Sequence, residues 1–319
     1  MEKRDIAVVG ASAGGIDALR QLVGNQPEDF AATIFVVLHI GPVSLLADIL
    51  RRSSKVPVDV AEDGARYECN HIYVAPPNRH LLIQDGHMKL SAGPRENGHR
   101  PAVDPLFRSA ARELRSRVAG VVLSGALDDG AAGLFAVKSR NGVAIVQDPK
   151  EAAAPDMPLS AMRHVSVDYC LPVAEIAEVL GKLSRGEAGE TKSAVEPGEM
   201  KLTKDELVSD PPPSENQISM ACPECDGPLY ETKEGQLAHF QCNVGHAFSP
   251  LSLSAAHGEA LERALWVAVR TLNERITLHR EMLKRDRNSG EEPLFRRLED
   301  SVRVAEQDVQ LLRQIIERI

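Results

Sequence analysis

Short, almost continuous apolar runs alternate with helical patterns through residues 1–184 of this chain. The runs are "IAVV", "TIFVVL", "AGVVLS" and "VAIVQ", and the first three precede helical patterns that begin near Gly15, Val43 and Gly130. Strands with so little polar alternation are buried on both faces, which is typical of a parallel sheet covered by helices on both sides. The alternation therefore predicts an α/β domain with a doubly wound, mainly parallel sheet. Two further runs, "HLLIQ" and "HMKLS", flank an Asp-Gly dipeptide and predict a β-hairpin.

The bulk composition argues against several classes of protein. Hydrophobic residues make up 43% of the 319 residues, which is enough for a packed core. The net charge of −9 and the pI of about 5.6 argue against binding to nucleic acids or anionic membranes. No apolar run approaches the roughly 20 residues of a membrane span, and the N-terminus lacks the apolar region of a secretory signal. We therefore expect a cytoplasmic protein that neither enters the membrane nor binds nucleic acid.

Composition divides the chain into four parts. Residues 1–184 are the predicted α/β domain, and the polar residues 185–217, with three consecutive prolines, predict a flexible linker. Residues 218–250 hold three of the five cysteines. Within residues 251–319, aliphatic residues recur at spacings of three and four, which predicts two amphipathic helices joined by a turn at "DRNSGEEP". This helical hairpin or coiled coil either packs only on itself or also binds a partner or a second copy of the chain.

Three cysteines and a histidine have the spacing of a metal site, C-x2-C and C-x3-H separated by sixteen residues. The candidate ligands are Cys222, Cys225, Cys242 and His246. Two close pairs of sulfur and imidazole ligands suit tetrahedral Zn²⁺, and a site with four protein ligands is structural. A redox dithiol or a set of free thiols is the alternative interpretation, and His239 is a further candidate ligand. Cys69 and Cys170 have no partner at ligand spacing, so we expect them to be ordinary buried thiols.

The first apolar run ends in "GASAGG", which places Ser12 between a strand and a helix. The stretch matches G-x-S-x-G, in which small neighbours allow a sharp turn that presents the serine hydroxyl above the sheet. It is also compatible with a phosphate-binding turn or with a serine that simply fits a crowded position. Against phosphate binding, both G-x-G-x-x-G and the lysine of a P-loop are absent.

A serine nucleophile needs a general base and a carboxylate that orients the base. The second apolar run is followed by His39, and "AGVVLS" runs into "GALDDG", which contains Asp128 and Asp129. The carboxyl ends of parallel strands meet at one edge of a sheet, so these side chains are expected to lie near Ser12. The pattern predicts a serine hydrolase and does not decide between the two aspartates.

Six stretches of sequence lie in order over about residues 5–180: "VVGASAGG", "LHIGP", "VAPPNRHLLI", "HRPAVDPLFRSAA", "VLSGALDDGAAGL" and "QDPKEAAAPDMP". Together they resemble the catalytic domain of the chemotaxis protein-glutamate methylesterases of the CheB type. The resemblance implies a Rossmann-like fold and hydrolysis of γ-glutamyl methyl esters on the cytoplasmic helices of methylated chemoreceptors, often with deamidation of glutamine. It also implies that Ser12 is the nucleophile, His39 the general base and Asp129 the orienting acid, with no cofactor for catalysis.

The surroundings of the predicted nucleophile depart from the family pattern. Ala13 stands where the family commonly has Thr, Leu38 where it has Gln, and Ala126-Leu127 where it has Met-Gly. Backbone donors survive such changes, so the N–H groups near Ala13 or Gly14 and near Ala126 are candidate oxyanion donors.

Four polar residues in the matching stretches are Arg79, His80, Arg100 and Asp104. They either line the substrate cleft, for which Arg100 is the candidate, or brace loops through hydrogen bonds, which is the preferred interpretation.

The family usually carries an N-terminal receiver domain, whereas the strand before Ser12 begins a few residues after Met1. We therefore expect regulation by the C-terminal extension or by a separate response regulator or other signalling partner that binds the C-terminal helices. A homodimer through these helices is a further expectation. Two other functions stay open: a weakly active signalling scaffold that binds receptors or partners, and a small-molecule carboxylesterase.

Overall fold

The computed structural model describes residues 3–27, 30–39, 41, 44–187, 217–234, 237–285 and 292–318. The chain forms two compact units, 1–253 and 254–319, which are described separately. Most of the predicted linker at 185–217, and most of the predicted turn at "DRNSGEEP", lies outside the described residues.

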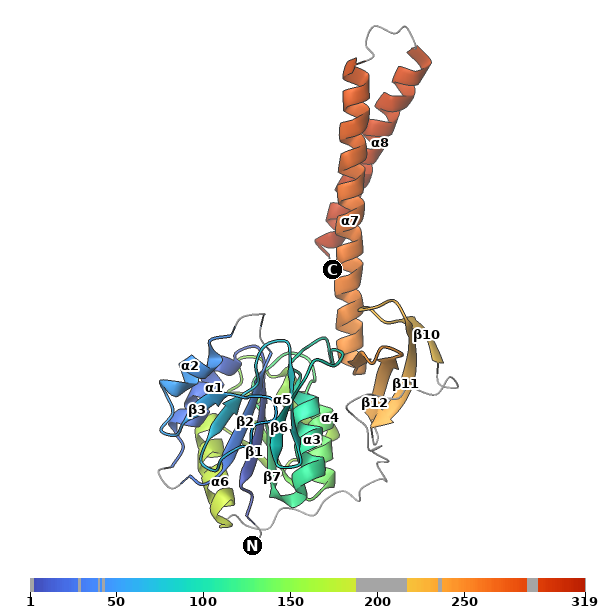
Figure 1. Cartoon of the computed structure of the whole chain (residues 1–319). Helices are drawn as coiled ribbons and strands as arrows, with labels where there is room; N and C mark the ends of the chain where they lie inside the picture. Colours follow the sequence, from blue (N-terminus) through green and yellow to red (C-terminus); the bar gives the residue numbers. More distant parts are fainter. Residues whose placement is uncertain are drawn as a thin grey trace. The chain divides into compact units, whose positions relative to one another are not determined.

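The first part of unit 1 alternates strands and helices (Figure 1). Its elements are β1 (Ile6–Ala11), α1 (Gly15–Gly24), β2 (Thr33–Leu38), α2 (Leu46–Arg51), β3 (Val58–Val60), β4 (Ile72–Val74), β5 (His80–Gln84), β6 (His87–Ser91), α3 (Val103–Leu114), the 3₁₀ helix η1 (Arg115–Arg117), β7 (Val118–Val122), α4 (Ala131–Ser139), β8 (Val143–Gln147), α5 (Asp156–His164), β9 (Tyr169–Leu171) and α6 (Val173–Arg185). The α2 helix begins at Leu46 rather than near Val43, and the Leu46 N–H donates a hydrogen bond to the Ser44 hydroxyl oxygen.

Seven strands form a parallel sheet in the order β3-β4-β2-β1-β7-β8-β9. The central strand β1 has β2 on one side and β7 on the other, and helices cover both faces. This confirms the predicted doubly wound, mainly parallel sheet. The predicted hairpin is also present: β5 and β6 pair antiparallel around Asp85 and Gly86, both of which have positive φ.

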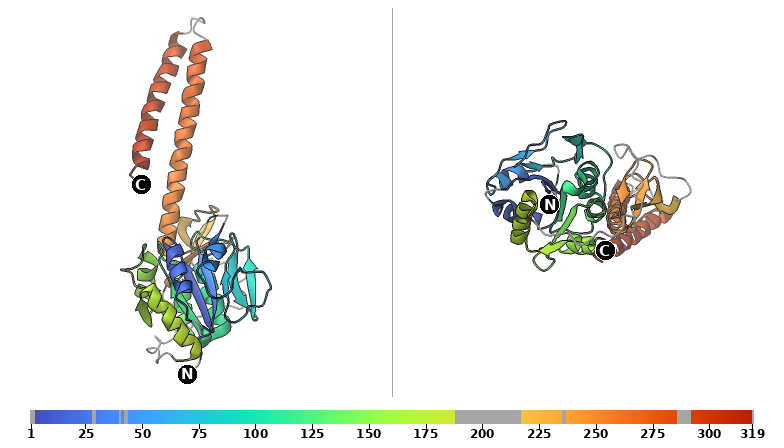
Figure 2. Two further views of the ribbon diagram at one scale, coloured as in Figure 1. Left: turned by 90° about the vertical axis from the view of Figure 1, so that its left-hand side faces the viewer. Right: turned by 90° about the horizontal axis from the view of Figure 1, so that it is seen from below.

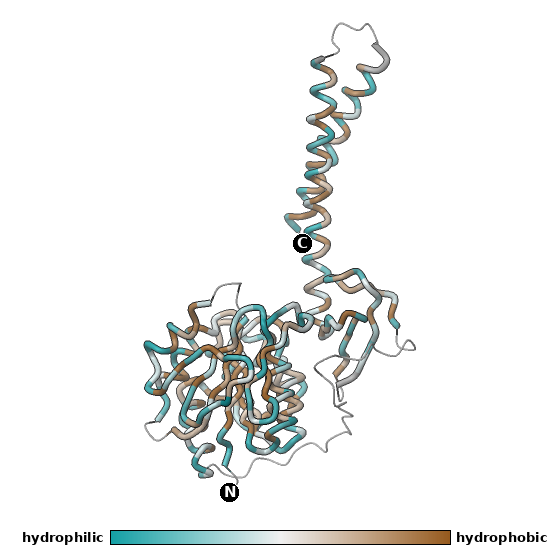
Figure 3. Tube along the Cα trace, viewed as in Figure 1, coloured by the Kyte–Doolittle hydropathy of each residue, from teal (hydrophilic) through white to brown (hydrophobic). Residues whose placement is uncertain are grey.

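The strands of the sheet are apolar throughout because they are buried on both faces. In β1, Ala7, Val9 and Ala11 pack in a cluster with residues of α1 and α6. The alternating residues Ile6 and Val8 pack in a second cluster with residues of α3 and α4. Figure 3 shows the hydrophobic residues concentrated along these strands. The sheet is therefore held by two cores, one on each face.

A small antiparallel sheet forms the rest of unit 1, in the order β10-β11-β12-β13. Its strands are β10 (Gln217–Ala221), β11 (Pro228–Glu234), β12 (Leu237–Cys242) and β13 (Ala247–Phe248). We call this sheet with its connecting turns the Cys/His unit, since it carries Cys222, Cys225, Cys242 and His246. It leads directly into helix α7 (Pro250–Arg285).

Unit 2 consists of most of α7 together with α8 (Glu292–Ile316), which lie side by side (Figure 2). Their apolar stripes pack on each other through Val269, Ile276, Ala305 and Val309, which confirms the predicted helical hairpin. Other large apolar side chains of the hairpin are exposed, among them Leu261, Trp266, Leu278 and Leu311. No helix in the described part of the chain is long and apolar enough to span a membrane.

The expectation that Cys69 and Cys170 are buried is wrong, because both side chains are exposed. Cys170 lies on β9, which is an edge strand of the parallel sheet. Cys69 lies in the irregular connection between β3 and β4. A cysteine in an edge strand or in an irregular connection can stay exposed, so the residue type alone did not ensure burial there.

Candidate active site

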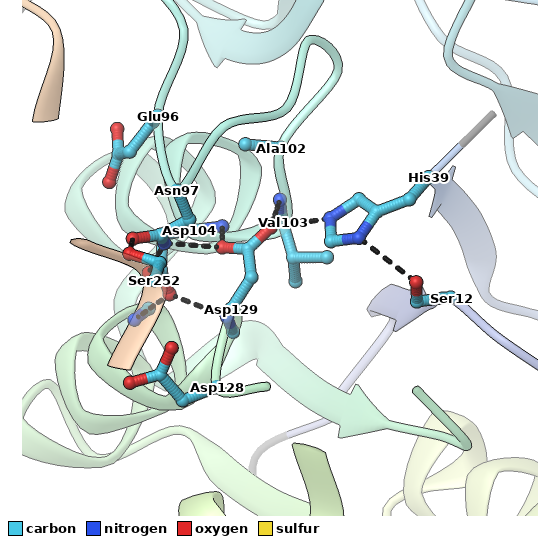
Figure 4. Close-up of polar contacts among 12 residues, drawn as sticks. Ser12, His39, Glu96, Asn97, Ala102, Val103, Asp104, Asp128, Asp129 and Ser252 are labelled. Atoms are coloured by element: carbon cyan, nitrogen blue, oxygen red, sulfur yellow. Dashed lines mark hydrogen bonds and ion pairs between the residues drawn. The ribbon is translucent and has the colours of Figure 1, made fainter. Parts of the chain in front are cut away.

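Three predicted site residues meet at the carboxyl edge of the parallel sheet (Figure 4). Ser12 directly follows β1 and His39 directly follows β2, while Asp129 lies beyond β7, just before α4. The Nδ1 atom of His39 lies 3.1 Å from Ser12 Oγ, and its Nε2 atom lies 2.7 Å from Asp129 Oδ2. Adjacent parallel strands thus bring a hydroxyl, an imidazole and a carboxylate into one hydrogen-bonded chain.

Asp129 is buried and accepts hydrogen bonds on both carboxylate oxygens. Its Oδ2 accepts from His39 Nε2 and, at 2.7 Å, from the backbone N–H of Val103. Its Oδ1 accepts from the Asn97 amide at 3.0 Å and from the backbone N–H of Asp104 at 3.2 Å. Burial opposes ionisation, but the hydrogen bond and charge of His39 and the Val103 N–H outweigh it and hold the pKa of Asp129 below its usual range.

The ionised carboxylate fixes the tautomer of His39. A carboxylate only accepts hydrogen bonds, so the neutral imidazole carries its proton on Nε2, which faces Asp129. The unprotonated Nδ1 atom then faces the Ser12 hydroxyl. This arrangement leaves His39 ready to take a proton from Ser12.

Asp128 makes a different set of contacts from its neighbour. Its Oδ1 atom accepts a hydrogen bond of 2.7 Å from the Ser249 hydroxyl. Burial raises the pKa of Asp128 above its usual value, with the Asp129 charge adding to the effect. Only Asp129 of the two aspartates bonds to His39 in the structure.

A second histidine lies against the first. The rings of His39 and His99 are stacked, with centroids 3.6 Å apart and planes inclined by 12°. Burial, followed by the nearby His39, lowers the pKa of His99 to about 4. His99 is therefore neutral near pH 7 and offers His39 a flat, uncharged surface.

The backbone around Ser12 provides candidate oxyanion donors. Ala13, Gly14 and Ala126 are exposed, and among the described residues no hydrogen bond engages their N–H groups. Gly14 precedes α1 with φ of 72°, and a Cβ atom there would lie 2.5 Å from the Cβ of Ala153. The position therefore requires glycine for both its conformation and its close packing.

Arg100 is engaged by loop carbonyls rather than left free. Its Nη1 atom donates to Ala92 O at 3.0 Å and to Gly93 O at 2.7 Å. Asp104 is buried, and its Oδ1 accepts from the N–H groups of Gly130 and Gly133. These contacts support the bracing interpretation for both residues.

The four candidate metal ligands converge in the Cys/His unit, with their ligand atoms all within 4.8 Å of one another. The Sγ atoms of Cys225 and Cys242 are 3.6 Å apart, and Nδ1 of His246 lies 3.7 Å from Cys222 Sγ and 3.6 Å from Cys242 Sγ. Tetrahedral zinc with ordinary bond lengths requires about 3.8 Å between two sulfurs and about 3.6 Å between sulfur and nitrogen. Burial raises the pKa of the Cys222 thiol to about 12, so its thiolate needs a bound cation to form near neutral pH. The donor set fits zinc.

Four residues near the site were not predicted from the sequence: Asn97, His99, Ser249 and Ser252. Asn97-Gly98 is a favoured dipeptide for a tight turn, and both residues have positive φ. Ser249-Pro250 is a favoured start for a helix. Both signals are local, and neither indicates a contact with residues far away in the sequence.

Comparison with known proteins gives consistent matches to the α/β domain. A family model described as CheB methylesterase matches residues 7–180. A relative from Leptospira interrogans is 40% identical over 181 residues, and the match covers 56% of this chain and 94% of that relative. Relatives from Anaeromyxobacter dehalogenans and Clostridium acetobutylicum, both named protein-glutamate methylesterase/protein-glutamine glutaminase, are 39% and 34% identical, covering 57% of this chain. This chain matches only 54% of the length of each of those two proteins.

The fold has a counterpart among solved structures. The crystal structure of the Thermotoga maritima CheB methylesterase catalytic domain matches with a TM-score of 0.54 and 34% identity. The match covers 57% of this chain and 100% of that domain.

Proposed function

Because this chain belongs to the CheB methylesterase family, we propose that it is a protein-glutamate methylesterase that hydrolyses γ-glutamyl methyl esters of chemoreceptors. The observation that carries the proposal is the hydrogen-bonded chain of Ser12, His39 and Asp129 at the carboxyl edge of the sheet. In this proposal Ser12 is the nucleophile, His39 the general base and Asp129 the acid that orients and stabilises the imidazole.

The reaction follows from the contacts of these three residues. His39 Nδ1 removes the Ser12 proton as Oγ attacks the ester carbonyl, and Asp129 stabilises the imidazolium that forms. The tetrahedral intermediate collapses, and His39 returns the proton to the departing methanol. Water, deprotonated by His39, then hydrolyses the glutamyl ester of Ser12 and leaves a glutamate carboxylate. A glutamine side chain would react in the same way with ammonia as the leaving group.

The oxyanion of the tetrahedral intermediate requires preorganised donors. The exposed N–H groups of Ala13, Gly14 and Ala126, which no hydrogen bond engages within the described residues, are proposed for this role. Backbone donors of this kind typically contribute about 10²–10³-fold each to the rate. Arg100 is assigned to bracing of its loop, because its guanidinium already bonds two carbonyls.

The Cys/His unit is proposed to hold a structural Zn²⁺ ion through Cys222, Cys225, Cys242 and His246. The spacing of the ligand atoms supports this, since three of the distances between them match edges of a zinc tetrahedron. Bound zinc would fix the two turns that carry the ligands, and it has no part in the ester chemistry.

The helical hairpin of unit 2 is proposed to bind a helical partner, either a second copy of this chain or a separate response regulator or signalling protein. Its exposed apolar side chains support this proposal. An open pocket there is lined by Trp266, Val269, Leu278 and Met282. Apolar side chains at helical spacing are the usual contact of helix-to-helix recognition.

The deciding experiment measures methanol release from a methylated chemoreceptor by the wild-type chain and by Ser12→Ala. We expect release by the wild type and a loss of at least about 10³-fold in the variant. No release with tight receptor binding retained would favour the scaffold function. Release only from small esters would favour a small-molecule carboxylesterase.

A further inference from the structure

The last strand of the Cys/His unit contacts the loop that borders the active site. The backbone N–H of Asn97 donates to Ala247 O at 2.8 Å, and the N–H of Ala247 donates to Arg95 O at 3.2 Å. Strand β13 thereby forms a parallel bridge to Glu96. The same loop carries His99, whose ring stacks on His39. A strand from the Cys/His unit thus holds an active-site loop that lies about 150 residues earlier in the sequence.

The Asn97 side chain connects the two segments. Its Nδ2 donates to Asp129 Oδ1 at 3.0 Å and to Asp104 Oδ2 at 3.1 Å. Its Oδ1 accepts from the Ser249 N–H at 2.9 Å and from the Ser252 hydroxyl at 3.0 Å. A backbone N–H only donates and a carboxylate only accepts, so these partners allow one orientation of the amide. Asn97 is only 4% exposed, so its side-chain hydrogen bonds are shielded from solvent.

The two serines are themselves held in place by hydrogen bonds in the first turn of α7. Ser249 accepts from the Ser252 N–H at 3.0 Å, which is an N-cap bond, and Pro250 occupies the first helical position. The Ser249 hydroxyl also donates to Asp128. Ser252 is only 3% exposed. Both donors to Asn97 therefore come from a turn with little freedom, which we call the Ser249–Ser252 turn.

We infer that Asn97 is a positioning residue for Asp129, and that the Ser249–Ser252 turn is a structural part of the active site. The inference rests on the proposed role of Asp129 as the orienting acid. The turn holds Oδ1 of Asn97, so that Nδ2 stays directed at the Asp129 carboxylate and supports its ionised form (Figure 4). A carboxylate that loses this donor rotates more freely, and its ionisation costs more.

The test uses the full chain with Asn97→Ala and Ser252→Ala. Ser254→Ala is the matched control, because Ser254 is an exposed serine on the same helix turn. We expect kcat for methanol release to fall about 10²-fold in Asn97→Ala and less in Ser252→Ala, with KM unchanged. The acid limb of the kcat/KM profile should move to higher pH in both, because each change weakens the support of ionised Asp129. Melting temperatures report any loss of folded protein separately.

A spectroscopic measurement keeps the inference independent of the reaction. With ¹⁵N-labelled histidine, the proton that His39 Nε2 donates to Asp129 gives a downfield signal, which should shift or broaden in both variants and not in Ser254→Ala. An unchanged signal and pH profile in Ser252→Ala and Asn97→Ala would overturn the inference. A wild-type chain that releases no methanol but shows the signal changes would instead overturn the proposed function and leave the positioning role standing.

Discussion

At the scale of single residues, the site depends on a choice between two adjacent aspartates. By sequence spacing alone, Asp128 and Asp129 were equally good candidates for the orienting acid, and only the family resemblance favoured Asp129. In the structure Asp129 bonds to His39, whereas Asp128 bonds to Ser249. The two aspartates are neighbours in the chain, yet their side chains bond to different partners. Residue spacing within a loop does not predict which of two neighbouring side chains faces the histidine.

The two aspartates give a matched pair of isosteric variants. Asp129→Asn places an amide against His39 and favours the wrong imidazole tautomer, so we expect kcat to fall by about 10³–10⁴-fold. Asp128→Asn keeps an oxygen that accepts from the Ser249 hydroxyl, and we expect less than about threefold loss. Methanol release at saturating receptor measures both. Equal losses in the two variants would contradict the assignment of roles.

His99 predicts a pH dependence of stability. Burial is the main cause that lowers the pKa of His99 from 6.5 to about 4 in the folded chain, and the nearby His39 lowers it further. The charge of Asp129 acts in the opposite direction. Between pH 6.5 and 4 the unfolded chain binds a proton that the folded chain does not, so this contribution to stability is complete above pH 6.5 and is lost as the pH falls toward 4.

The variant His99→Phe keeps a flat ring against His39 and removes the titrating group. We expect its free energy of unfolding, from urea titrations at several pH values, to fall less steeply than that of the wild type between pH 6.5 and 4. Parallel curves for the two proteins over this range would contradict the lowered pKa of His99 in the folded chain.

At the scale of elements, the N-termini of helices α3 and α4 are each capped by an aspartate that lies near the start of the other helix. Neither α3 nor α4 has a side-chain cap from its own N-cap residue. Asp129, just before α4, accepts from the N–H groups of Val103 and Asp104 at the start of α3. Asp104, in turn, accepts from Gly130 and Gly133 at the start of α4. Both helix N-termini thus stabilise a buried carboxylate.

The helices and strands themselves were largely readable from the sequence. The apolar runs became β1, β2, β7 and β8, because strands buried on both faces need apolar residues at every position. The reciprocal capping of α3 and α4 was not readable, since each helix lacks a local capping residue and finds its acceptor about 25 residues away.

At the scale of the whole molecule, the Cys/His unit is connected to the α/β domain through the loop that carries Asn97 and His99. The candidate ligand His246 immediately precedes β13, which bonds to the loop of Asn97 and His99. If zinc fixes the ligand turns, its removal should loosen both β13 and that loop.

Metal removal tests this coupling on the full chain. We expect the wild type to hold stoichiometric zinc, and expect a chelator or Cys242→Ser to remove it. Hydrogen exchange should then rise in residues 217–249 and in residues 95–99, and labelling of Ser12 by a fluorophosphonate should slow. Cys170→Ser removes an exposed thiol far in sequence from the cluster and is the control. Metal-free protein with unchanged exchange in both segments would refute the coupling.

The sequence by itself determined the parallel α/β sheet, the helical hairpin, the metal-ligand spacing and the identity of Ser12 and His39 as candidates. Each of these depends on periodicity, on the spacing of cysteines and histidines or on strand ends, which are local properties of the chain. Only the tertiary structure showed the hydrogen bond between His39 and Asp129, and it alone joined Ser249 and Ser252 to Asn97 across about 150 residues. Such contacts depend on how separately folded segments pack, and the hydrogen-bonding groups that make them leave no periodic trace in the sequence.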